Sequence, residues 1–154
     1  MQYWLFKSEP GCFSIDDLSK RPKQISPWDG VRNYQVRNML RDQIKKGDQG
    51  FFYHSSCTPP GVAGIIEVVR EGYPDFTAWD LDSEHYDPKS TPENPRWYMV
   101  DVKLIKKFSH FVALDEIKKQ PQLKNMLIMR KGNRLSITPV TKEEWKRIVE
   151  LGGK

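Results

Sequence analysis

The stretches KSEP at residues 7–10 and SPWDGVRNY at residues 26–34 decide how this chain is organised. Each joins rigid turn residues to polar or aromatic side chains. Pro10 fixes its own backbone and restricts Glu9 to an extended geometry, so the first stretch is a stiff exit from the apolar run before it. In the second stretch Trp28 stands among Pro, Asp and Gly, where a tryptophan has less core to enter. We expect the two stretches to border one pocket for a flat polar ring.

Around these stretches the sequence predicts strands separated by short helices. Apolar or alternating runs indicate strands at 2–7, 49–55, 62–69, 96–108 and 133–140. Helical spacing and capping residues indicate helices at 15–20, 34–45, 115–120 and from 142 onward, with shorter helical turns near 76–79 and 121–125. The long, polar 73–96 excursion is of a length that is more often functional than idle. The expected fold is α+β: one domain over residues 1–154, with a mixed, curved sheet or pseudo-barrel flanked by short helices.

Composition limits the classes of protein to consider. The chain has 154 residues, of which 38% are hydrophobic and 29% are charged, as is typical of a globular domain. No apolar run reaches the roughly 18 residues of a membrane span, and the first residues do not resemble a signal peptide. We therefore expect a cytoplasmic protein without a membrane partner. The net charge is +5, and basic residues dominate from 103 onward, which suits a polyanion as partner or simply a solvated lysine-rich surface.

Aromatic side chains supply the candidate walls of a ring-binding pocket. A planar base stacks on such faces, and each contact is worth about 1–3 kcal/mol. Core packing explains most of the aromatic residues, including Trp97 and Trp145. Trp28 and Trp79 differ, because both lie in predicted polar loops, and we expect them to hold a ring between them.

Polar residues near these aromatics are candidates for the pocket edge. Lys7 and Ser8 follow a strand end, where they would hydrogen-bond a ligand or form an ordinary charged turn. Arg32 and Asn33 precede a predicted helix; the Asn33 amide would recognise a base edge, cap the helix, or do both. Arg130 lies in a basic turn that would grip a phosphate or form an exposed hairpin.

Catalysis remains an alternative at residues 54–57. His54 lies beside Ser55 and Cys57, residue types that can form a nucleophile and its base. No Gly-x-Ser-x-Gly elbow, phosphate loop or dinucleotide-binding glycine pattern occurs in the sequence. His54, Cys57, His85 and His110 match no tight zinc spacing. We therefore expect no catalytic residue, no metal and no cofactor.

Several longer sequence motifs resemble those of the EVE-domain family. They occur in order along the whole chain: YWLFKSEP (3–10), WDGVRNYQ (28–35), FYHS (52–55), GIIEV (64–68), WYMVDV (97–102), GNRLS (132–136) and PVT (139–141). The resemblance implies a PUA-like fold related to the YTH domains, which hold a flipped, often modified base in an aromatic pocket. It carries no catalytic role.

The resemblance therefore implies a non-catalytic binder of DNA or RNA that recognises a flipped modified nucleobase, with a modified cytosine as first choice. The residues expected to bind the ligand are Lys7, Ser8, Trp28, Arg32, Asn33, Tyr34, Tyr53, His54, Ser55, Trp79 and Arg130. A monomer is expected, with a weak dimer as the other possibility. Two alternatives stay open: a small enzyme acting on a nucleoside or heterocycle through His54, Ser55 or Cys57, and a module that binds a peptide or metabolite.

Overall fold

A six-stranded mixed sheet forms the framework of the protein, whose computed structural model describes residues 1–130 and 135–153. The strands follow the order β2-β5-β4-β3-β1-β6 across the sheet. β1 and β3 run parallel, and the other neighbouring pairs are antiparallel. Their bounds are β1 (Tyr3–Ser8), β2 (Ile25–Pro27), β3 (Gln49–His54), β4 (Gly61–Pro74), β5 (Tyr98–Ala113) and β6 (Ile137–Val140). The predicted α+β class is confirmed, with the sheet left open because β2 and β6 do not pair within the described residues.

Short helices flank the sheet, as the sequence predicts. Ser14 and Thr141 form capping boxes, and the Asn33 side chain accepts from the backbone N–H of Val36, so the predicted Asn33 cap is present. The helices are α1 (Ile15–Ser19), α2 (Tyr34–Asn38) with a π-helical turn (Met39–Gln43) after it, α3 (Leu114–Lys118) and α4 (Lys142–Gly152). In the described ranges, four 3-10 turns occupy Pro22–Gln24, Phe76–Trp79, Pro121–Leu123 and Leu127–Met129. None of the described helices is long and apolar enough to cross a membrane.

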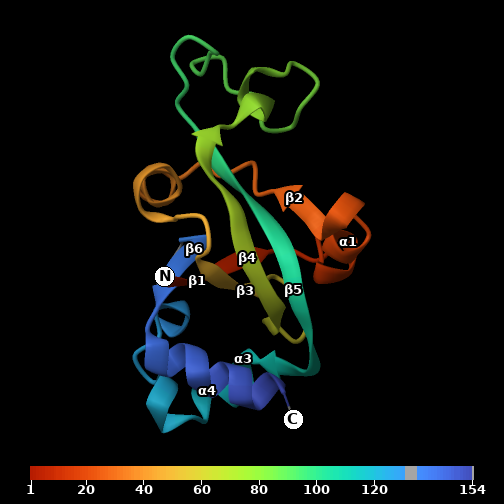
Figure 1. The fold of residues 1–154 in the computed structure, drawn as a ribbon, viewed down its shortest axis with the longest axis vertical. Helices are drawn as coiled ribbons and strands as arrows, with labels where there is room; N and C mark the ends of the chain where they lie inside the picture. The colour runs from red at the N-terminus through yellow and green to blue at the C-terminus, as the bar shows by residue number, and fades with distance from the viewer. Residues whose placement is uncertain (131–134, 154) are drawn as a thin grey trace.

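β4 and β5 form a long twisted ribbon that runs through the molecule (Figure 1). Both strands extend beyond the predicted ends at residues 69 and 108, and four register shifts let the pairing continue through irregular stretches. The excursion 75–97 lies at one end of the ribbon, and α3 and α4 lie at the other. β2 was not predicted, because its three residues form a strand only by pairing with the edge of β5. The predicted strand at 133–140 is observed from Ile137, and its first residues fall outside the described part of the chain.

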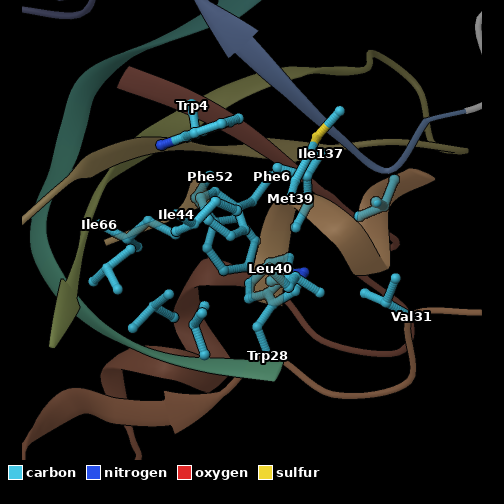
Figure 2. Packing of buried hydrophobic residues seen from close by; sticks show 14 of the residues in the cluster. Trp4, Phe6, Trp28, Val31, Met39, Leu40, Ile44, Phe52, Ile66 and Ile137 are labelled. Atoms are coloured by element: carbon cyan, nitrogen blue, oxygen red, sulfur yellow. The ribbon is translucent and has the colours of Figure 1, made fainter. Parts of the chain in front are cut away.

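Two buried clusters, called core 1 and core 2, cover opposite faces of the sheet. Successive residues of β1 alternate between them, as the period of a strand requires: Trp4 and Phe6 enter core 1, whereas Leu5 enters core 2. Core 1 contains Trp28 and Phe52 and is packed by α1 and α2 (Figure 2). Core 2 is covered by α3 and α4, and its members include Phe51, Tyr53, Ile117, Trp145 and Ile148.

Candidate functional site

A surface pocket of about 440 Å³ lies beyond the end of β1, next to the loop that follows β2. Its volume falls in the range of small-molecule sites, roughly 300–1,000 Å³. The stretches 7–10 and 26–34 meet here, together with two residues of the 75–97 excursion. The lining residues are Lys7, Ser8, Glu9, Cys12, Phe13, Arg21, Ser26, Pro27, Trp28, Asp29, Glu84 and His85.

Trp28 belongs both to the pocket wall and to core 1. Its residue is only 7% exposed, and its backbone N–H donates to Val100 O at 2.7 Å. Phe6, Phe13 and Phe52 meet the indole edge to face, with ring centres 5.2, 6.3 and 5.4 Å away. The expectation that Trp28 had little core to enter was wrong, because phenylalanines from β1 and β3 supply that core. Among the described residues, no aromatic ring stacks flat on this indole.

A buried carboxylate holds the loop after Trp28 in place. Asp75 Oδ2 accepts from the backbone N–H of Gly30 at 2.8 Å and from Arg32 Nη1 at 3.1 Å, and Oδ1 accepts from the Thr77 N–H at 2.9 Å. Burial alone would raise the pKa of Asp75, but the hydrogen bonds from Thr77, Gly30 and Arg32 outweigh it and lower that pKa. Arg32 also donates to His85 O. Its guanidinium thus joins the loop to the excursion.

Gly30 lets the excursion close against the loop. It has a φ of +79°, and a Cβ at this position would come within 2.6 Å of His85 Nε2. The His85 Nδ1 lies 3.3 Å from Thr77 Oγ1, which helps to fix the ring. Glu84 and His85 thereby reach a pocket whose other residues lie more than fifty positions earlier in the chain.

Lys7 and Asp29 are the charged side chains of the pocket without a partner. Within the described residues, neither side chain forms an ion pair or a hydrogen bond to another side chain. Burial lowers the pKa of the Lys7 ammonium. Asp29 is exposed as a residue. Burial of its carboxyl nevertheless raises the pKa of Asp29; the Asp75 charge adds to this effect, and His85 opposes it. With Arg21, Glu9 and Glu84 also present, the pocket rim is mixed in charge and not uniformly basic.

Three of the predicted ligand residues, Lys7, Ser8 and Trp28, line this pocket together. Asn33 and Tyr34 do not. Asn33 is exposed and caps α2, whereas Tyr34 stacks on Trp97 with ring centres 4.8 Å apart. Arg37 packs on the Tyr34 ring, 5.1 Å from its centre. These residues form a separate cation–π surface beside the excursion.

Tyr53, Trp79 and Arg130 also lie away from the pocket. Tyr53 is 3% exposed in core 2, because it follows Phe52 on β3 and points to the opposite face of the sheet. Trp79 is half-buried in the 3-10 turn of the excursion and does not line this pocket, so the structure does not bring it to Trp28 there. Phe13 is the second aromatic wall instead.

The candidate catalytic residues His54, Ser55 and Cys57 form separate contacts and do not hydrogen-bond to one another in the described ranges. His54 Nε2 accepts a hydrogen bond from the Ile15 N–H at 3.2 Å, which occupies the lone pair that a general base would use. Ser55 donates its backbone N–H to Ser8 O, and the Cys57 thiol lies 3.5 Å from Pro59 O. No hydrogen bond joins the three side chains in the described ranges, where no three metal-ligating side chains gather either.

Asp29, Phe13 and His85 were missed as pocket residues. Asp29 follows Trp28 directly and lies in the same turn-forming stretch, which is the pattern that would have identified it. His85 gives no comparable pattern, since only the contacts of Asp75 and Gly30 bring it to the pocket.

Comparison with known proteins settles the family. A model of the EVE domain matches residues 2–151. The chain belongs to the EVE-domain family. Human thymocyte nuclear protein 1 is 44% identical over 169 residues, which cover 99% of this chain and 74% of the human protein. The resemblance to the EVE-domain family, inferred from the sequence motifs, is confirmed.

Solved structures show the same PUA-like architecture. A hypothetical protein from Leishmania major superimposes with a TM-score of 0.92 at 47% identity, over 99% of this chain and 94% of that one. Human thymocyte nuclear protein 1, crystallised in complex with DNA that contains 5-methylcytosine, gives a TM-score of 0.91 at 44% identity over 100% and 99% of the two chains. An ASCH protein from Zymomonas mobilis, 11% identical with a TM-score of 0.56, shares the fold alone.

Proposed function

We propose that this EVE-domain protein binds DNA carrying a modified cytosine and holds that base, turned out of its stack, in the pocket beside Trp28. One observation carries the proposal: the pocket lies in a chain that matches, over its full length, a human protein crystallised with 5-methylcytosine DNA. Turning a base out costs a few kcal/mol. Stacking on aromatic faces returns about 1–3 kcal/mol per contact, so a lined pocket offsets that cost.

The pocket supplies both parts of base recognition. Trp28 offers an indole on which, within the described residues, no aromatic ring already stacks flat. Ser8 Oγ–H donates to Phe13 O at 2.6 Å, so the hydroxyl oxygen keeps its lone pairs as acceptors. Arg21 brings positive charge to the rim, where the flanking phosphates of an extruded nucleotide would lie.

In this proposal Lys7, Ser8 and Trp28 contact the ligand, and Arg32 positions the pocket wall through Asp75. Five other predicted residues act outside the pocket or by stabilising the fold: Asn33, Tyr34, Tyr53, Trp79 and Arg130.

The site binds without chemistry. His54 uses its Nε2 lone pair on the N–H of Ile15 and would have to leave α1 to accept a proton from a nucleophile. The rival that keeps a physical argument is a small polar metabolite, because the rim carries carboxylates as well as cations. Nucleic-acid binding falls steeply with salt, whereas binding of a neutral metabolite does not.

The test is a binding panel with fluorescent oligonucleotides that carry one cytosine or one 5-methylcytosine, as DNA and as RNA, at several salt concentrations. We expect salt-dependent binding with a preference for the methylated DNA. Trp28→Leu should abolish that preference. Trp145→Leu is the matched control, because Trp145 is also 7% exposed but lies in core 2.

The outcomes separate the candidates. A preference for the methylated RNA would support base binding in the pocket but identify RNA as the partner. Binding that ignores methylation, salt and Trp28 would refute the proposal and favour the metabolite.

A further inference from the structure

Two charged residues of the pocket, Lys7 and Asp29, form no ion pair within the described part of the chain. Most polar pocket groups are engaged: Arg21 lies 5.3 Å from the Phe13 ring centre, Ser8 donates to Phe13 O, and His85 lies 3.7 Å from Glu84. Lys7 and Asp29 line the same pocket; among the described residues neither side chain forms an ion pair, and the Asp29 carboxyl has a hydrogen bond with its own backbone. One offers donors only and the other, when ionised, acceptors only.

A pyrimidine base presents complementary groups. Cytosine carries an amino donor at C4 and a carbonyl acceptor at C2. Thymine carries a carbonyl at C4, and adenine carries an amino group but no carbonyl. Carboxylates are the side chains that accept from the cytosine amino group when proteins recognise that base.

We propose that Asp29 accepts a hydrogen bond from the C4 amino group of the bound base, while Lys7 donates to its C2 carbonyl, so that the pocket selects cytosines over thymine and adenine. The inference rests on the proposed function and adds which residues choose the base. Trp28 would stack on the ring of any base, and the polar pair would discriminate among bases.

The electrostatics of the pocket support this assignment. Burial raises the pKa of Asp29 against the lowering effects of His85 and of a backbone hydrogen bond at Asp29, so a further donor at the carboxylate would favour its ionised form. An amino group arriving beside it supplies one. The C4 carbonyl of thymine would instead place oxygen against oxygen, and a site built to hydrogen-bond one group rejects an analogue that leaves its polar groups unpaired.

Thymine is the sharpest probe, because it is 5-methylcytosine with a carbonyl in place of the amino group and a proton on N3. Binding to single-stranded oligonucleotides, in which no base pair must open, is measured for one central 5-methylcytosine, thymine or adenine. We expect the wild type to prefer 5-methylcytosine over thymine at least about tenfold. Asp29→Asn should bring that ratio close to one, since an amide both donates and accepts. Lys7→Gln should weaken the preference over adenine.

Glu84→Gln is the matched control, because it removes the same charge from the same rim. Any general gain in affinity from reduced repulsion of phosphates is then common to both variants, and only Asp29→Asn should change the ratio. The inference is overturned if Asp29→Asn keeps the wild-type ratio, or if the wild type prefers 5-methylcytosine over cytosine yet binds thymine equally well. If the wild type shows no methylation preference, the proposed function itself fails.

Discussion

Trp28 and Trp145 pack against aromatic residues on opposite faces of one sheet, and Trp28 but not Trp145 lines the pocket at the end of β1. Each residue is 7% exposed. Trp145 lies flat against Phe51 and Tyr3, with ring centres 4.1 and 4.5 Å away. Trp28 meets its aromatic neighbours edge to face. Aromatic content alone therefore does not distinguish a binding face from a closed core.

The difference comes from what covers each face. A continuous amphipathic helix, α4, lies over core 2 and supplies Trp145 itself (Figure 1). The region of core 1 around Trp28 is bordered by loops, which are fixed by polar contacts such as those of Asp75. Loops leave space for a ligand, and the buried Asp75 carboxylate fixes the position of the loop that borders that space.

The largest expected effect comes from filling the pocket. Cys12 is exposed and lines it, whereas Cys57 lies elsewhere. A bulky maleimide on Cys12, in a Cys57→Ser background, should abolish binding of methylated DNA, because the label occupies the site. The same label on Cys57, in a Cys12→Ser background, should leave binding nearly unchanged. Equal losses in the two labelled proteins, measured by fluorescence anisotropy, would place the DNA outside this pocket.

Asp75→Asn tests whether the open face depends on its buried carboxylate. The change removes the charge that accepts from Arg32 and Gly30, and hydrogen bonds to a charged group contribute about 1.5–3 kcal/mol. We expect a loss of about 2–3 kcal/mol in the free energy of unfolding, measured in urea, and weaker binding of DNA. Asp82→Asn, at an exposed position of the same excursion, should change the stability by less than about 0.5 kcal/mol. A neutral result at Asp75 would refute its structural role.

Substitutions at two helix caps compare the core 1 face of the sheet, which is open, with the core 2 face, which is closed. Asn33 caps α2 on the open face, and Thr141 caps α4 on the closed one. Substituting either residue with Ala should cost about 1 kcal/mol in thermal or urea unfolding. Because Asn33 is exposed and does not line the pocket, Asn33→Ala should keep the preference for methylated DNA. Loss of that preference at unchanged stability would show that the Asn33 amide contacts the base.

The smallest expected effect is a pH dependence that originates at His54. Burial lowers the pKa of His54 from 6.5, with Asp16 raising it and Lys107 lowering it further. The unfolded chain therefore takes up a proton at His54 as the pH falls below about 6.5, and the folded protein resists it until a lower pH. Between those two pKa values the unfolded state binds more protons, so stability falls as the pH falls. In urea titrations, His54→Gln should flatten this slope.

The fold was predictable wherever local chemistry decides it. An apolar, aromatic-rich run identified β1, alternation identified β5, and oxygen-bearing caps identified the starts of α1, α2 and α4. β2 escaped, because a three-residue segment that ends in Pro27 is a strand only through its partner β5. Long-range pairing, with its register shifts, likewise set the ends of β4 and β5.

The site was predictable only where its residues are close in sequence. Lys7 and Ser8 stand at a stiff strand exit, and Trp28 stands in a turn-rich stretch, so all three could be named. Tyr53 was misplaced because Phe51, Phe52 and Tyr53 are all aromatic, so hydrophobicity does not indicate which of them faces which core.

The most direct test of the account is a crystal structure of this protein with a short DNA duplex that carries one 5-methylcytosine. We predict that the methylated base leaves the helix and lies against Trp28, with its amino group at Asp29 and its C2 carbonyl at Lys7. A base that stays stacked in the duplex, or one bound at the Tyr34–Trp97 surface while the pocket remains empty, would contradict it.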